Sequence, residues 1–319
     1  MFNHPNIITI FILNLIIFIF TIIALYVSIR ISLYYDKNST TQRQYKLDKL
    51  SYLGSIVIKF ILYIKIPALI FFVYTQDVLS DFISGAMCGA GVVTASSVGA
   101  YLLMIKIISI YLFGLWLLLD NIDNKRVDRK FSHLKFILFI PISLILFAEI
   151  IMEFYHFNAL DPKQIVSCCG NLFNATQKSF VGSLITIAPT NALILFYLNF
   201  IALFLSFKYI KLFSALNISF FIISLISLIV IFSPYIYELP THKCPFCILQ
   251  KDYYYIGYVL YTSIIIGTFS GIATIVLHLT NLKYKKWQIV SLLFNSFYLT
   301  VVSFYIIRYY FINGVWLGV

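Results

Sequence analysis

Eight apolar runs, each long enough to cross a lipid bilayer, constrain the fold of this chain more than any other feature. A transmembrane helix needs about 20 mostly apolar residues. The runs lie near residues 7–33, 52–74, 97–119, 135–155, 181–206, 210–234, 253–279 and 289–311. Backbone amides find no partner in hydrocarbon, and the runs lack the alternation that is typical of barrel strands, so each is predicted to form a helix. We therefore expect an all-α, polytopic integral membrane protein of about eight transmembrane helices.

The overall composition excludes a water-soluble globule. Hydrophobic residues make up 61% of the 319 residues and charged residues only 11%, which is too little polar surface to cover one. The short connections leave no room for a separate soluble domain, so residues 1–319 are expected to form a single helical membrane domain. Three of the loops, 75–96, 156–180 and 235–252, are predicted to share one face of the membrane.

The distribution of lysine and arginine predicts the orientation of the chain. Segments 34–51, 120–135, 208–211 and 280–288 carry fourteen of these residues, whereas the three loops on the opposite face carry Lys163, Lys178, Lys243 and Lys251. Because basic residues accumulate in cytoplasmic loops, we expect both termini on the outer, periplasmic side. The net charge of +11 follows from this topology and from attraction to anionic lipid headgroups, so no nucleic-acid partner is expected. The bias toward Ile, Phe, Asn and Lys suggests a bacterial multi-pass protein of the inner (plasma) membrane.

All five cysteines fall in the three predicted outer loops. They are Cys88, Cys168, Cys169, Cys244 and Cys247. Free cysteine usually behaves as a small buried hydrophobe, so its absence from the spans indicates that these five are placed for their sulfur chemistry. Disulfides that staple the outer loops of a non-catalytic membrane subunit or transporter are one interpretation. The odd number argues against it, as does the adjacent pair Cys168–Cys169, which would close a strained ring if oxidised.

The segment "THKCPFC", residues 241–247, predicts thiol–disulfide exchange. Pro245 suits the first turn of a helix, which would place Cys244 at the N-terminus of the seventh span, where the helix dipole favours the thiolate. In this hypothesis Cys244 attacks a disulfide, Cys247 resolves the product, and the remaining cysteines relay electrons to a quinone or to a periplasmic protein partner. The string C-P-F-C resembles the dithiol of glutaredoxin-type enzymes, which implies similar local thiol chemistry. Cysteines in outer loops above membrane helices also resemble those of membrane thiol oxidases of the disulfide-bond-forming and vitamin K epoxide reductase types, which implies electron transfer to a quinone.

Binding of a soft metal ion is the alternative function of the same cysteines. Thiolates favour Cu(I), and the protein would then deliver the ion for assembly of a periplasmic metalloenzyme. The candidate ligands are Cys88, Cys168, Cys169, His242, Cys244 and Cys247. Attachment of c-type haem is excluded, because Ile248 follows Cys247 where that motif requires histidine.

Ionisable residues inside the predicted spans form a second candidate site. Glu149 and Glu153 are one helical turn apart in the fourth span, and Lys65, Lys106 and Arg308 lie in other spans. Charges are costly in a bilayer and need either partners or a function. The cluster either fixes the packing of the helices or forms a proton path or a polar pocket for a quinone headgroup or substrate. Candidate cofactor-binding residues are therefore Glu149, Glu153, Lys106 and Arg308.

Overall fold

The computed structural model describes residues 4–36, 39, 41–126, 130–161, 166 and 188–318. Eight of its helices are long and apolar enough to cross a membrane, which confirms the predicted helical, multi-pass architecture. The first four are α1 (Pro5–Tyr34), α2 (Gln42–Ser80), α4 (Gly99–Asn124) and α5 (Ser132–Ala159). The other four are Pro189–Lys208, Ile210–Tyr237, α10 (Ile256–Leu279) and α11 (Lys285–Asn313). No strand occurs among the described residues, and the side of the membrane on which each terminus lies stays a prediction.

Two of these spans are composite. Pro189–Lys208 consists of α7 (Pro189–Leu205) and a short 3-10 turn. Ile210–Tyr237 is continuous but irregular, with α8 (Ile210–Ser227), a π-helical turn (Leu228–Phe232) and α9 (Ser233–Tyr237). A short helix, α3 (Gly89–Ala95), lies between α2 and α4.

The helix α2 is much longer than the apolar run that predicts it. It spans 39 residues and includes polar residues on the N-terminal side of the 52–74 run. The side chain of Thr41 caps its start by accepting a hydrogen bond from the backbone N–H of Gln44 at 3.3 Å. Since no glycine or proline interrupts residues 42–51, the helix extends beyond the segment that hydrophobicity alone identifies.

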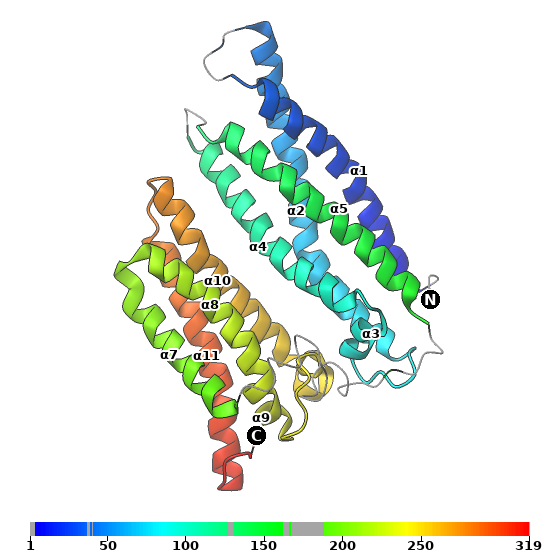
Figure 1. The fold of residues 1–319 in the computed structure, drawn as a ribbon, viewed down its shortest axis with the longest axis vertical. Helices are drawn as coiled ribbons and strands as arrows, with labels where there is room; N and C mark the ends of the chain where they lie inside the picture. The colour runs from blue at the N-terminus through cyan, green and yellow to red at the C-terminus, as the bar shows by residue number, and fades with distance from the viewer. Residues whose placement is uncertain are drawn as a thin grey trace. The chain divides into compact units, whose positions relative to one another are not determined.

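The chain forms two compact units, each held together by contacts among its own residues. Unit 1 consists of Met1–Ser84 and Val92–Gln164, and unit 2 consists of Gly85–Gly91 and Ile165–Val319. The long helices of unit 1 are α1, α2, α4 and α5, and those of unit 2 are α7, α8, α10 and α11 (Figure 1). The segment that carries Cys88 therefore groups with the second unit, although it connects two helices of the first.

The core of unit 1 is aromatic and aliphatic. Trp116 on α4 packs edge-on against Phe139 on α5, and both are buried together with Phe113 and Phe136. The indole N–H of Trp116 donates to the backbone carbonyl of Lys135 at 2.8 Å. This hydrogen bond satisfies the polar group that a tryptophan otherwise carries into an apolar core.

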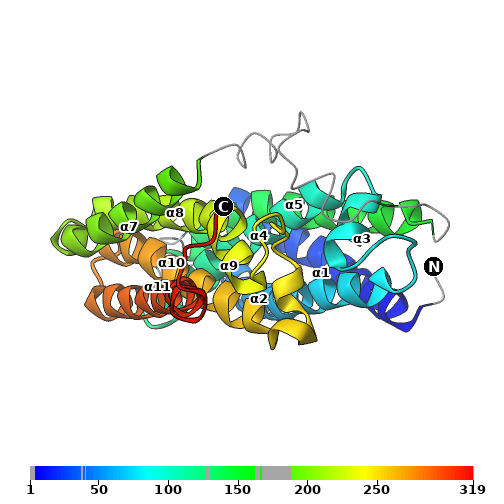
Figure 2. The same cartoon turned by 90° about the horizontal axis from the view of Figure 1, so that it is seen from below.

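In unit 2, α10 packs against both α8 and α11, and α7 packs against α8 (Figure 2). Two glycines of α10 permit close approach of polar side chains. A Cβ at Gly271 would lie 2.1 Å from Cγ of Asn217, and one at Gly267 would lie 2.1 Å from Oδ1 of Asn295. The amide of Asn295 donates to Oδ1 of Asn217 at 3.0 Å, which links α11 to α8. Hydrogen bonds of this kind stabilise helix association where water is absent.

Candidate functional site

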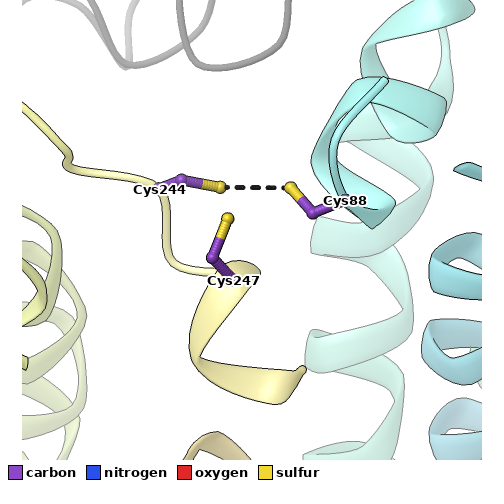
Figure 3. Close-up of side chains that lie close together, drawn as sticks. All are labelled: Cys88, Cys244 and Cys247. Carbon is purple, nitrogen blue, oxygen red and sulfur yellow. Dashed lines mark hydrogen bonds between the residues drawn. The ribbon is translucent and has the colours of Figure 1, made fainter. Parts of the chain in front are cut away.

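Three cysteines from two distant segments meet within unit 2. The sulfur atoms of Cys88, Cys244 and Cys247 all lie within 4.8 Å of one another, and the sulfurs of Cys88 and Cys244 are 3.6 Å apart (Figure 3). Cys88 and Cys244 are 0% exposed and Cys247 is 5% exposed. None of the three forms a disulfide. The three sulfurs therefore form a compact, buried set of soft donor atoms, which we call the three-thiol cluster.

The backbone of the C-P-F-C segment is held by two tyrosine hydroxyls. Tyr237, the last residue of α9, donates to the carbonyl of Cys244, and Tyr261 on α10 donates to the carbonyl of Pro245 at 2.8 Å. Both hydrogen bonds are made to main-chain atoms, so they fix the path of the segment without involving the thiols. The two helices thus determine where Cys244 is placed.

The segment around Cys88 is fixed separately. The side-chain amide of Gln250 donates to the carbonyl of Met87 at 3.0 Å, which ties this segment to the one that carries Cys247. Gly85 adopts φ +85°, and a Cβ there would lie 2.2 Å from the carbonyl oxygen of Val166. Only glycine fits this close approach at a positive φ, so the turn that leads to Cys88 depends on it.

The predicted position of Cys244 at the start of the seventh span is wrong. The span α10 begins at Ile256, and Cys244 lies in an irregular segment before a 3-10 turn formed by residues Cys247–Leu249. A second 3-10 turn, Lys251–Tyr253, and two residues with left-handed backbone, Tyr254 and Tyr255, separate this turn from α10. The dipole of α10 is therefore not directed at the thiol of Cys244, which has the other two sulfurs among its described neighbours.

The remaining predicted sulfur-site residues lie elsewhere. Cys168 and Cys169 fall outside the described residues. His242 is not one of the group whose ligand atoms lie within 4.8 Å of one another. Its ring packs edge-on against Tyr237 with centroids 4.4 Å apart, and its buried Nε2 has no hydrogen-bond partner among the described residues.

Two tyrosines, Tyr237 and Tyr253, lie next to the cysteine-bearing segment. Burial first, and then the nearby Cys247 and Asp252, raise the pKa of Tyr253 above its ordinary value. Its ring contacts that of Tyr237 with centroids 4.6 Å apart. The phenol stays protonated at neutral pH, so it adds no negative charge next to the thiols.

The predicted cluster of charges inside the spans forms in unit 1. Lys106 on α4 lies 2.8 Å from Glu149 and 3.0 Å from Glu153, both on α5, and Lys65 on α2 lies 2.9 Å from Glu149. Asn14 on α1 donates to Glu153 at 3.1 Å. All five side chains are buried. Two lysines and two glutamates balance in charge, so we call this group the buried charge cluster.

Arg308 forms its described ion pair with another residue, Glu238. It lies in unit 2, where its guanidinium is 3.8 Å from the carboxylate of Glu238 and both side chains are about half exposed. Within the cluster, Asn14 links Glu153 to Lys65, because an amide can both donate to Glu153 and accept from Lys65, which lies at 3.4 Å.

A second group of charges, buried except for the partly exposed Lys59, was not predicted. Asp120 on α4 lies 2.8 Å from Lys59 and 2.9 Å from Lys135, and Asp123 lies 3.0 Å from Lys135. Lys135 counts as a loop charge by sequence, yet it lies inside α5 and is 3% exposed. The signal that could have revealed the group is the pair of aspartates at the end of an apolar run, opposite a lysine at the start of the next.

No family model matches the chain, and neither a curated protein nor a solved structure matches it.

Proposed function

We propose that this multi-pass membrane protein binds a soft metal ion, Cu(I) in the first place, through Cys88, Cys244 and Cys247. The observation that carries the proposal is the convergence of three buried sulfurs from two segments that are 156 residues apart in sequence. Three sulfurs bound to one ion at about 2.3 Å lie about 4 Å from each other, if the zinc–sulfur distance is taken as a guide. The spacing within 4.8 Å therefore needs little adjustment to accept an ion.

The donor set favours Cu(I) over Zn(II). Structural zinc sites are almost always four-coordinate, whereas the described residues bring together three sulfurs and no fourth ligand. Soft thiolates suit both Cu(I) and zinc, so the number of ligands is what favours Cu(I) here. Thiols must lose their protons to bind, so we expect the affinity to rise with pH. With the cysteines on the periplasmic side of an inner membrane, as the charge distribution predicts, the bound ion would be delivered to a periplasmic metalloenzyme.

Thiol–disulfide exchange is the second candidate function. The observation that favours it is the 3.6 Å separation of the Cys88 and Cys244 sulfurs, because this separation places an attacking thiolate next to a possible partner. Electrons would pass to or from a quinone or a protein partner. Burial of all three thiols weighs against direct exchange with a large partner, since attack requires access to the sulfur.

Competition for Cu(I) tests the proposal. The reduced, detergent-solubilised chain is titrated anaerobically against the Cu(I) chelator bicinchoninate, together with three single cysteine-to-serine variants and a matched Cys168→Ser/Cys169→Ser control. We expect one tightly held ion per chain, a loss of more than about 100-fold in affinity for each of Cys88→Ser, Cys244→Ser and Cys247→Ser, and little change in the control. Equal binding by all variants would refute the three-sulfur site.

Trapping experiments separate the second candidate. If exchange with a protein is the function, a chain that lacks one of these cysteines accumulates a mixed disulfide with its partner in acid-quenched cells. Under metal binding no such adduct forms and the bound copper falls instead.

A further inference from the structure

We infer that metal binding and a Cys88–Cys244 disulfide are mutually exclusive states of the three-thiol cluster, so that reaction with an external disulfide empties the metal site. The inference deepens the proposed function and rests on it. The three-thiol cluster would then act as a metal site whose occupancy depends on the redox state of its surroundings.

The geometry supports this inference because one sulfur belongs to both states. The sulfur of Cys244 is a member of the donor set and also lies 3.6 Å from the sulfur of Cys88. The two sulfur atoms of a disulfide are about 2.05 Å apart. A small rotation of the side chains is enough to bring the two sulfurs from this separation to bonding distance. Formation of the bond removes two of three thiolates from the donor set and leaves Cys247 as the single remaining ligand.

The segments around the cluster hold the two sulfurs together in the reduced state. Tyr237 and Tyr261 fix the carbonyls of Cys244 and Pro245, and Gln250 fixes the carbonyl of Met87 beside Cys88. Since these bonds are made to the main chain, neither a bound ion nor a disulfide needs to break them. The same framework serves both states.

Differences in exposure indicate the order of reaction. Cys247 is 5% exposed, whereas Cys88 and Cys244 are fully buried. Cys247 therefore attacks the external disulfide RSSR, forms a mixed disulfide and releases one RSH. Cys244 then attacks the sulfur of Cys247 and releases the second RSH, and Cys88 attacks Cys244 and returns Cys247 to the thiol. In total, RSSR and the thiols of Cys88 and Cys244 give two RSH and the Cys88–Cys244 disulfide.

Linkage makes the effect reciprocal. An ion that binds only the reduced form makes oxidation of the thiols less favourable. The factor by which it does so equals the factor by which oxidation weakens binding of the ion. Copper at 100 times its dissociation constant should shift the thiol–disulfide equilibrium about 100-fold toward the thiols. For a two-electron couple this is about 59 mV in midpoint potential, at 29.6 mV for each factor of ten.

The test uses the full chain in detergent, both unmodified and as the Cys168→Ser/Cys169→Ser variant, loaded anaerobically with one Cu(I). Glutathione disulfide is added, released copper is measured with bicinchoninate, and disulfides are mapped by peptide mass spectrometry. A parallel sample receives glutathione in twice the molar amount, because that thiol is a product of the reaction and itself binds copper. We expect release of copper in step with the Cys88–Cys244 disulfide, and no such release in the parallel sample.

Separate outcomes overturn the inference and the proposed function. A reduced chain that binds no Cu(I) refutes the proposed function, and this inference with it. A chain that holds the Cys88–Cys244 disulfide and still binds copper as tightly as the reduced chain refutes the inference alone, and so does a map that shows only Cys244 joined to Cys247. The variant Cys247→Ser tests the order of attack, since it should form the Cys88–Cys244 disulfide at least about 10-fold more slowly.

Discussion

Replacement of Lys106 by methionine is the sharpest test of the buried charge cluster. The ammonium group lies 2.8 Å from Glu149, 3.0 Å from Glu153 and 4.6 Å from the ring centroid of Phe72. Its removal leaves two buried glutamates facing one remaining lysine, Lys65, and thus one uncompensated negative charge. Breaking a buried ion pair by removal of one partner costs about 3–5 kcal/mol. We expect a loss of that size in the free energy of unfolding.

A double substitution separates charge imbalance from lost packing. Lys106→Met/Glu153→Gln removes one charge of each sign, and the glutamine oxygen can still accept the hydrogen bond from Asn14. We therefore expect the double variant to lie within about 2 kcal/mol of the native chain, and thus to be at least about 1 kcal/mol more stable than Lys106→Met alone. The exposed residue Lys46 provides a matched control, because Lys46→Met makes the same chemical change on a surface and should cost less than about 0.5 kcal/mol.

The assay follows the fluorescence of Trp116, which is buried in the same unit. The chain has 3 tryptophans, so Trp287→Phe/Trp316→Phe leaves Trp116 as the reporter of unit 1. Unfolding is induced by titration with sodium dodecyl sulfate in mild detergent. A Lys106→Met variant as stable as the Lys46→Met control would refute the argument, and so would a double variant that is less stable than Lys106→Met alone.

Three further predictions concern unit 2. Gly271→Ala should lower the melting temperature, because its Cβ would meet Asn217 at 2.1 Å, and adding Asn217→Ala should restore part of the loss; a neutral Gly271→Ala would contradict the close packing. Gln250→Ala should weaken Cu(I) binding by about fivefold in bicinchoninate competition, since about 1 kcal/mol of hydrogen bonding then no longer holds the segment beside Cys88; unchanged affinity would show that this bond does not position the thiol. Arg308→Gln should change the free energy of unfolding by less than about 0.5 kcal/mol and should leave the copper affinity unchanged, because its ion pair is long and exposed. A large effect on either quantity would indicate that Arg308 has a role inside the membrane.

Hydrophobicity predicts the helices because lipid permits few alternatives. All eight apolar runs correspond to helices, and the errors are at their ends, as in α2, where polar residues that favour helix continue the element beyond the apolar run. The pairing of Lys65 and Lys106 with Glu149 and Glu153 was also predictable, since charges inside spans need partners. The role of Arg308 stays a prediction, because its described ion pair is with Glu238 in unit 2 and depth in the membrane does not specify which helices are neighbours.

The cysteine cluster was only partly predictable. Composition and loop position indicated that Cys88, Cys244 and Cys247 share a compartment, but the contact itself depends on the turn at Gly85 and on the Gln250 amide. Pro245 misled the prediction of a helix start, because it is equally compatible with the irregular segment that tyrosine hydroxyls hold in place. Long-range hydrogen bonds to the main chain leave no periodic signal in a sequence.

The π-helical turn at Leu228–Phe232 sets the rotational register of everything that follows it in the same span. A π turn accommodates one more residue than an α turn, and each residue of an α-helix advances the side-chain direction by about 100°. Tyr237, which holds the carbonyl of Cys244, lies five residues beyond this turn. If the same residues formed a regular α-helix without the π turn, Tyr237 would be turned by about 100° about the helix axis and its hydroxyl would swing away from the cysteine loop. A change of helix type inside the membrane would thus disconnect the sulfur site at the end of the helix, without any substitution in the site itself.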